Sequence, residues 1–250
     1  MNLCDYTTIR DLLARHGFHF SKSMGQNFLI DPEVPRRIAE ASGADETCGV
    51  LEIGPGIGPL TAELAQRAGK VVAVELDRAL LPVLAETMAP YPNVEIVPGD
   101  VLKLDLKALT AEKFPGLTPM VCANLPYNVT SPILEKLVET PCFPSFTVMI
   151  QREVARRLCA PQGSAEGGSF SLFLQYHMEP ELLFDVPPEK FLPAPKVTSS
   201  VIRCVRRDRP AVEVEDEAFF FKVVRGGFLL RRKTLANSLA AALPGVSKEG

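Results

Sequence analysis

The sequence predicts an α/β fold in which helices cover both faces of a mainly parallel sheet, followed by a small helical domain. The first observation is an apolar strand pattern at 48–53 that runs into three glycines at alternate positions and then into a helical pattern. This order, a strand followed by a glycine turn and a helix, is typical of the beginning of a nucleotide-binding βαβ unit. The second is a series of further apolar runs of strand length separated by helical patterns, which is typical of a parallel sheet. The third is a change of composition after Pro210, where acidic residues precede two helical stretches.

Capping signals define the helices of the N-terminal half. Thr7 is expected to cap a short amphipathic helix that ends at residue 15. Asp31 followed by Pro32 predicts a helix through about residue 42, because proline is favoured at the first helical position. Asp77 is expected to cap the helix after the second strand. Residues 18–29 are neither alternating nor helical, and their amides and aromatic rings suit a loop over a ligand as well as a packed arm.

Hydrophobic periodicity gives the remaining elements. Strands are expected at about 48–53, 71–75, 94–97, 120–123, 145–150, 179–185 and 199–206. Further helices are expected at about 60–68, 78–88, 131–139, 151–158, 170–177, 218–224 and 231–243. Residues 1–207 are therefore expected to form one α/β domain with an N-terminal arm, and residues 208–250 a small helical domain.

Composition favours a globular protein of the cytoplasm. The net charge is −3, but residues 151–250 are net basic whereas residues 1–150 are net acidic, so a polyanion is expected to bind the C-terminal part. The six cysteines form no C-x-x-C pair, and no apolar run suggests a signal segment or a membrane span. His16 and His19 lack partners in a metal-ligand pattern, so no metal site is expected.

Candidate ligand-binding residues follow three successive predicted strands. Gly54, Glu75 and Asp100 each come at or just past a strand end, and in an open parallel sheet ligands lie beyond these ends. A carboxylate at Glu75 can accept both hydroxyl protons of a ribose. Asp100 can accept a hydrogen bond from an adenine amine, although a turn aspartate would look the same. Glu52 beside the glycine turn would repel a pyrophosphate but suit a cationic ligand, so the loop resembles the S-adenosylmethionine (SAM) loop of methyltransferases more than a dinucleotide loop.

The end of the fourth predicted sheet strand carries Asn124, Leu125, Pro126 and Tyr127. An amine on an aromatic base is a poor nucleophile, because its lone pair is delocalised into the ring. The amide oxygen of Asn124 and the backbone carbonyl of Leu125 can each accept one of its N–H bonds and favour a pyramidal nitrogen. Pro126 fixes the backbone, and Tyr127 offers a face on which a base can stack. The structural alternative is a strand-to-loop turn with a buried tyrosine.

Five segments in this order resemble the ribosomal RNA adenine dimethyltransferases over about residues 7 to 243. They are Ser23-Met24-Gly25-Gln26-Asn27-Phe28-Leu29, Glu52-Ile53-Gly54-Pro55-Gly56-Ile57-Gly58, Asn124-Leu125-Pro126-Tyr127-Asn128, Gln151-Arg152-Glu153-Val154-Ala155 and Phe191-x-Pro193-x-Pro195-Lys196-Val197. The resemblance implies a Rossmann-like SAM-dependent methyltransferase domain and transfer of two methyl groups to each of two adjacent adenosines near the 3′ end of small-subunit rRNA. It implies SAM contacts from Asn27, Leu29, Gly54, Glu75, Asp100 and Asn124, and stacking of Phe191 on a flipped adenine.

The resemblance also implies a partner, namely rRNA within an immature small ribosomal subunit, bound by a monomer. The basic side chains expected to bind it are Arg152, Arg156, Arg157, Arg206, Arg207, Arg231, Arg232 and Lys233. The chain ends sooner after its last predicted helix than is usual in this family, which predicts an incomplete helical domain.

Three other functions fit part of the pattern. A macrolide-resistance methyltransferase of large-subunit rRNA shares most of these motifs, although Asn128-Val129-Thr130-Ser131-Pro132 favours the small-subunit enzyme. A binding protein of the same fold, such as a ribosome-assembly or transcription factor, would have methylation only as a secondary role. A NAD-dependent dehydrogenase is disfavoured, because the sequence shows no evident proton-relay histidine or Tyr-Lys pair.

Overall fold

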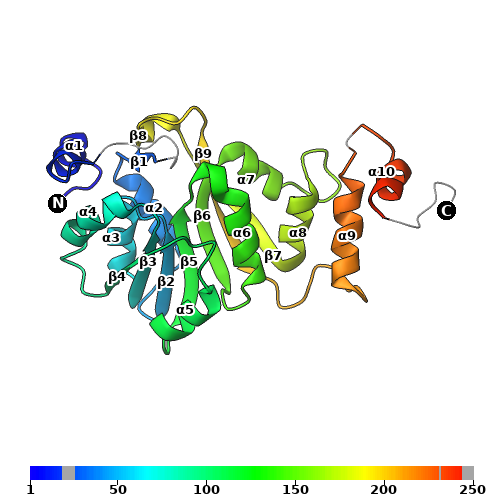
Figure 1. Cartoon of the computed structure of the whole chain (residues 1–250), viewed down its shortest axis with the longest axis horizontal. Helices are drawn as coiled ribbons and strands as arrows, with labels where there is room; N and C mark the ends of the chain where they lie inside the picture. The colour runs from blue at the N-terminus through cyan, green and yellow to red at the C-terminus, as the bar shows by residue number, and fades with distance from the viewer. Residues whose placement is uncertain (19–25, 231, 244–250) are drawn as a thin grey trace.

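The computed structural model describes residues 1–18, 26–230 and 232–243. Its centre is a seven-stranded sheet with the order β4-β3-β2-β5-β6-β9-β7 (Figure 1). The strands are β2 (Cys48–Ile53), β3 (Lys70–Glu75), β4 (Val94–Pro98), β5 (Thr118–Asn124), β6 (Ser145–Gln151), β7 (Met178–Val186) and β9 (Ser199–Arg206). Each strand predicted from the apolar runs is present, and the α/β class is confirmed.

The strand order places a crevice at one point of the sheet. β2, β3, β4, β5 and β6 pair in parallel, whereas β9 is antiparallel to both β6 and β7. The chain builds outward from β2 through β3 to β4 and then returns to β5 on the other side of β2. The connections that leave β2 and β5 therefore diverge, and such a reversal opens a ligand crevice at the carboxyl ends of the strands.

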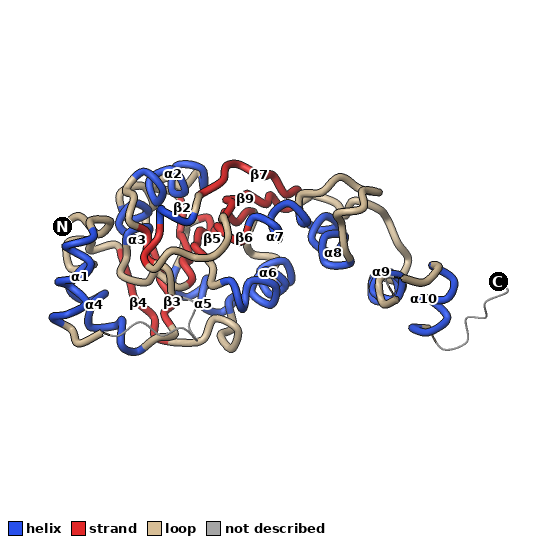
Figure 2. The backbone as a smooth tube through the Cα atoms, turned by 90° about the horizontal axis from the view of Figure 1, so that it is seen from above, coloured by secondary structure: helices blue, strands red, loops and turns tan. Residues whose placement is uncertain are grey.

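Helices cover both faces of this sheet, and Figure 2 shows α2 and α6 on opposite sides of it. The helices are α1 (Tyr6–Arg15), α2 (Glu33–Ser42), α3 (Pro59–Ala65), α4 (Leu81–Thr87), α5 (Leu106–Lys113), α6 (Thr130–Glu139), α7 (Arg152–Leu158), α8 (Ser169–His177), α9 (Glu217–Gly227) and α10 (Leu235–Ala242). One buried cluster joins α2 and α3 to the sheet, and a second joins α5, α6, α7 and α8 to its other face. The two cores make the sheet a rigid support for the residues at its edge.

The two C-terminal helices lie beyond α8, at the end of the molecule away from the N-terminus (Figure 1). Aromatic rings join α9 to α8, with ring centroids 5.3 Å apart for Phe173 and Phe221 and 5.0 Å apart for Tyr176 and Phe221. α9 and α10 approach closely at Gly226, where an added Cβ would lie 2.8 Å from the Cβ of Ala242. Within the described ranges, no helix has both the length and the apolar character needed to cross a membrane.

Several local features differ from the sequence predictions. Helix α2 begins at Glu33 with Pro32 as its N-cap, rather than with Asp31 as the cap and Pro32 as the first helical residue. The first helix is capped by Asp5 rather than Thr7, since Asp5 Oδ2 accepts a hydrogen bond from the Thr8 backbone N–H at 2.8 Å. Helix α5 was not predicted, because its segment mixes lysine, threonine and glutamate with few apolar positions. The predicted loop at 18–29 ends in strand β1 (Phe28–Leu29), which pairs antiparallel with β8 (Phe191–Leu192). This small sheet ties the N-terminal arm to a distant loop. Residues 19–25 lie outside the described ranges.

Candidate functional site

The reversal between β2 and β5 holds a cavity of about 230 Å³. The structure brings together on its wall every predicted cofactor contact and the whole turn after β5. These residues are Asn27, Leu29, Gly54, Glu75, Asp100, Asn124, Leu125, Pro126 and Tyr127. They come from the N-terminal arm and from the ends of β2, β3, β4 and β5, so one site collects segments that are far apart in the sequence.

The glycine turn is shaped by backbone conformation and by close packing. Gly54, Gly56 and Gly58 have φ values of +68°, +64° and +94°, which residues with a Cβ rarely adopt. A Cβ on Gly58 would also lie 2.5 Å from Met88 Cε, and one on Gly56 would lie 3.3 Å from the Phe28 ring. The turn therefore brings bare backbone to the cavity wall between β2 and α3.

Glu75 closes the end of β3 and is 6% exposed. Its Oε1 accepts a hydrogen bond from the Asp77 backbone N–H at 2.7 Å, which fixes the carboxyl group at the cavity wall. Burial raises the pKa of Glu75, and the backbone donors of Asp77 and Gly56 offset part of this effect. Gln26 Nε2 donates to Asp77 Oδ2 at 2.7 Å, so the arm before Asn27 is tied to the same turn. Gln26 also lines the cavity and was not singled out as a site residue from the sequence.

Asp100 follows β4 and is a turn aspartate that also lies on the cavity wall. Its Oδ1 accepts a hydrogen bond from the Leu102 backbone N–H at 3.0 Å, as a turn aspartate does. Its Oδ2 lies 3.7 Å from Lys103 Nζ, on a lysine side chain that is mostly exposed. The same residue lines the cavity. The turn therefore fixes a carboxylate at the cavity wall, and its contact with an adenine amine stays a prediction.

The negative charge expected on Glu52 from the sequence does not match its surroundings in the structure. The side chain is 1% exposed on β2, and the described residues offer its Oε2 no hydrogen-bond partner. Burial raises the pKa of Glu52 to about 8, and the nearby Glu75 adds to the shift. The carboxyl group is thus mainly protonated at pH 7, rather than the fixed negative charge that the sequence suggested. A neutral Glu52 does not repel a pyrophosphate, so the preference for a cationic ligand cannot rest on its charge.

The turn after β5 is held by hydrogen bonds to the neighbouring elements. The Leu125 N–H donates to the Met149 carbonyl at 3.1 Å, which ties the turn to β6. The Pro126 carbonyl accepts from Thr130 Oγ1 at 3.0 Å at the start of α6. Burial raises the pKa of the Tyr127 hydroxyl. The tyrosine is part-buried, as the structural alternative required, yet its residue lines the cavity.

Phe191 is not on the cavity wall. It is 2% exposed in β8, pairs with Leu29 and packs in the cluster that includes Val34 and Ile38 of α2. In this conformation the ring is a core side chain rather than a stacking surface. The predicted stacking on adenine would require the ring to leave that cluster.

Two of the predicted RNA-binding arginines are occupied by the protein itself. The Arg206 guanidinium donates to the backbone carbonyls of Leu137, Val138, Thr140 and Phe143 at 2.9 to 3.3 Å. It thus binds carbonyls at and just beyond the C-terminus of α6, so this guanidinium has a structural role in the protein, and its RNA contact stays a prediction. Arg207 lies at the end of the sheet in a similar position. It donates to the Gln175 carbonyl at 3.0 Å and to Glu179 Oε1 at 2.7 Å.

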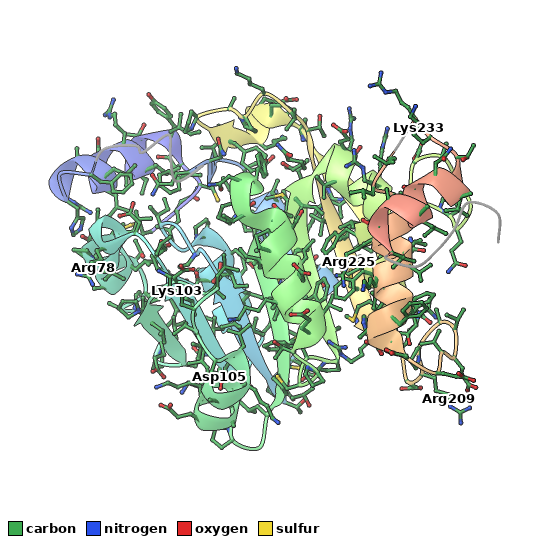
Figure 3. All side chains as sticks on the ribbon, turned by 45° about the vertical axis from the view of Figure 1, so that its right-hand side comes forward. Arg78, Lys103, Asp105, Arg209, Arg225 and Lys233 are labelled. Carbon is green, nitrogen blue, oxygen red and sulfur yellow. The ribbon has the colours of Figure 1, made fainter. Side chains whose placement is uncertain are left out.

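The other predicted basic residues that the structure describes lie on the surface. Arg152, Arg156 and Arg157 line a groove between α7, residues 165–169 and Phe228. Arg157 pairs with Glu153 at 3.0 Å and Arg152 lies 3.7 Å from Asp185. Among the described residues, no ion pair is found for Arg156, Arg232 or Lys233, and all three are exposed. Figure 3 shows Lys233 and Arg225 at the helical end of the molecule. Arg231 lies outside the described residues.

Comparison with known proteins decides the family. The family described as "Ribosomal RNA adenine dimethylase" matches residues 17–249. The chain belongs to this ribosomal RNA adenine dimethylase family. It is therefore a methyltransferase enzyme with ribosomal RNA as its class of substrate, which confirms the family resemblance and removes the dehydrogenase alternative.

Individual relatives of this dimethylase cover nearly the whole chain. Ribosomal RNA small subunit methyltransferase A of Geobacillus sp. (strain WCH70) is 50% identical over 238 residues, 94% of this chain and 81% of that protein. The protein of the same name from Bacillus mycoides (strain KBAB4) is 50% identical over 242 residues, 96% of this chain and 83% of that protein.

Solved structures agree with this assignment. The 23S rRNA methyltransferase ErmE superposes with a TM-score of 0.71 at 31% identity, covering 87% of this chain and 85% of that one. A dimethyladenosine transferase from Plasmodium falciparum superposes with a TM-score of 0.69 at 26% identity, covering 84% and 74%. The Rossmann-like methyltransferase fold of this dimethylase is thereby confirmed.

Several cavity residues of the dimethylase carried no sequence signal. Leu80, Val101, Leu102, Val129 and Ile133 supply apolar wall from short helices and loops. The sequence does not show whether an isolated leucine or valine in such a segment packs in the core or contacts a ligand. Among the described residues, no group of three or more His, Cys, Asp or Glu side chains is arranged to hold a metal ion.

Proposed function

We propose that this dimethylase transfers two methyl groups from SAM to the exocyclic amine of each of two adjacent adenosines near the 3′ end of small-subunit rRNA. The observation that carries the proposal is the cavity in which Gly54, Glu75 and Asp100 meet Asn124. The relatives of about 50% identity named small subunit methyltransferase A support the choice of ribosomal subunit.

The donor set of the cavity fits SAM. Glu75 offers a buried carboxylate for the two ribose hydroxyls, and Asp100 offers one for the adenine amine. The backbone of Gly54 lies at the wall with no Cβ to obstruct the methionine part. Asn27 and Leu29 line the cavity from the arm, and Asn124 lines it from the end of β5. Bound SAM supplies an electrophilic methyl group on its sulfonium.

The turn after β5 prepares the substrate amine. The amide oxygen of Asn124 and the carbonyl of Leu125 accept its two N–H bonds and stabilise a pyramidal nitrogen whose lone pair is free to attack. Pro126 limits the motion of that carbonyl, and Tyr127 provides the stacking face. No strong base is required, because the nitrogen becomes acidic as the new C–N bond forms and then loses its proton to solvent. Positioning supplies most of the rate enhancement.

RNA is proposed to bind along the exposed basic side chains beyond β6. Arg152, Arg156 and Arg157 lie in the groove beside α7, which begins directly after β6 and so stands at the same sheet edge as Asn124. Arg231, Arg232 and Lys233 are proposed as further RNA contacts, and they belong in sequence to the region that we propose as a separate small domain, residues 208–250. The proposed partner is the immature small subunit in the cytoplasm, bound by one copy of the chain.

The test is transfer of labelled methyl groups from SAM to purified ribosomal subunits that lack the modification. We expect label in small-subunit rRNA and none in large-subunit rRNA. Label confined to the large subunit would favour the second candidate, a large-subunit methyltransferase, which the likeness to ErmE supports. Absence of transfer to either subunit, with SAM bound, would favour an assembly factor of the same fold.

A further inference from the structure

The hydroxyl of Tyr127 is held by a residue from a distant part of the chain. Tyr127 Oη lies 2.5 Å from Ser199 Oγ, and either hydroxyl can donate in this hydrogen bond. Ser199 is fully buried at the start of β9 and is not on the cavity wall. The ring of Tyr127 is therefore fixed at both ends, by its backbone in the turn after β5 and by its hydroxyl on β9.

The position of Ser199 is set by the sheet. Ser199 pairs with Gln151 across β6 and β9, and Asn124 pairs with Met149 across β5 and β6. Ser199 thus stands at the same edge of the sheet as Asn124, two strands away. A strand held on both sides by backbone hydrogen bonds moves little, so Ser199 is a firm anchor for a ring that would otherwise rotate about its two side-chain bonds.

The bond also connects one motif segment to the residues just after another. The segment from Phe191 to Val197 is followed by Thr198 and then by Ser199, and the Thr198 carbonyl accepts a hydrogen bond from the Arg152 N–H at 2.9 Å. The Tyr127 hydroxyl therefore connects the turn that carries Asn124 to the end of this proline-braced loop.

We propose that Ser199 is a positioning residue for methyl transfer, which holds the Tyr127 ring at the tilt needed to stack the target adenine against Asn124. The proposal rests on the proposed function, because it assumes an adenine substrate at this turn. Ser199 does not touch the substrate itself and acts through Tyr127. Loss of the hydroxyl bond would leave the base free to sample orientations in which its amine is misaligned for transfer.

A double-mutant cycle tests this role. Ser199→Ala and Tyr127→Phe each remove the same hydrogen bond, and each should lower the single-turnover methyl-transfer rate at saturating small subunits by about 3- to 10-fold. The double variant should be no slower than the slower single variant, because only one bond is lost. The dissociation constant of SAM, measured by calorimetry, should stay within about twofold of wild type.

Ser200→Ala is the matched control. Ser200 is also fully buried on β9, but its hydroxyl donates to Asp185 Oδ1 at 2.5 Å instead of to the tyrosine. It should leave the rate at saturating small subunits unchanged. If Ser199→Ala fails to fold, Tyr127→Phe still removes the bond from the cavity side.

Three results would overturn the proposal. The first is a full rate for Ser199→Ala or for Tyr127→Phe, and the second is a double variant whose loss equals the product of the single losses. The third is an equal loss of rate in Ser200→Ala. A wild-type chain that methylates no small subunit would instead overturn the proposed function, and this inference with it.

Discussion

The buried carboxyl group of Glu52 makes the free energy of unfolding depend on pH. One substitution, Glu52→Gln, removes this contribution alone. Burial raises the pKa of its carboxyl group from the usual 4.5 to about 8 in the folded protein. Between these two values the folded state keeps a proton that the unfolded state releases. Since the unfolded state binds fewer protons in this window, the stability contributed by this group falls as pH rises. Glu52→Gln removes the titration and keeps the shape of the side chain.

The size of the effect follows from the two pKa values. Each unit of pKa corresponds to about 1.4 kcal/mol, so the penalty of ionising Glu52 grows by roughly 3–4 kcal/mol between about pH 5 and about pH 8.5. We therefore expect Glu52→Gln to gain roughly this amount of stability relative to wild type over that range. Urea unfolding of both proteins at both pH values measures this gain. Taking the difference in the free energy of unfolding between the two proteins cancels the contributions of the other titrating groups.

Glu95→Gln is the control for this measurement. A hydrogen bond from Lys113, with a second lysine at position 70, lowers the pKa of Glu95, so this carboxylate is ionised in the folded state and largely ionised in the unfolded state from about pH 5 upward. Its substitution should change stability by the same amount at both pH values. An equally constant difference for Glu52→Gln would refute the reasoning, because it would show that Glu52 is already ionised in the folded cavity.

Three further predictions concern the cofactor, the core and the RNA surface. Glu75→Ala should weaken SAM binding by about 1.5–3 kcal/mol in calorimetry, the range for hydrogen bonds to a charged group, and tighter binding of NADH than of SAM by the wild-type protein would contradict the cofactor assignment. Phe191→Ala should lower the free energy of unfolding by about 3–5 kcal/mol, as for other buried aromatic rings, and an unchanged stability would show that the ring is not part of the core. Arg156→Ala should weaken rRNA binding and reduce its dependence on salt by about one released counterion, whereas Arg206→Ala should lower the thermal midpoint. Equal effects of the two arginine substitutions on RNA affinity would argue against the division between surface and structural arginines.

The sheet and its ligand edge were predictable from the sequence because both depend on local patterns. Apolar runs of strand length marked each of the seven strands, and the topology of a parallel sheet then placed Glu75 and Asp100 at one edge. The turn at Asn124 was predictable for the same reason, since it follows a buried strand directly. Helix α5 was missed because its periodicity is weak over only eight residues.

Features that depend on long-range contacts were not predictable. The pairing of β1 with β8 joins residues more than 160 positions apart, and no local pattern shows that Phe191 is buried by it. Arg206 is the last residue of β9, and the sequence around it indicates an exposed side chain. Only the fold shows that the C-terminal carbonyls of α6 accept hydrogen bonds from it. Ser199 likewise has no signal of its own, because its meaning comes from a tyrosine 72 residues away.

The central claim is that the cavity transfers methyl groups to adenine amines through Asn124. Mass spectrometry of rRNA, after reaction of wild type or Asn124→Ala with unmodified small subunits and SAM, tests it most directly. Wild type should produce dimethyladenosine at two adjacent positions, and Asn124→Ala should produce it on the order of 100-fold more slowly with an unchanged thermal midpoint, since the lost acceptor is a preorganised polar group. A near wild-type rate for Asn124→Ala, or methyl groups on any other rRNA position, would contradict the account.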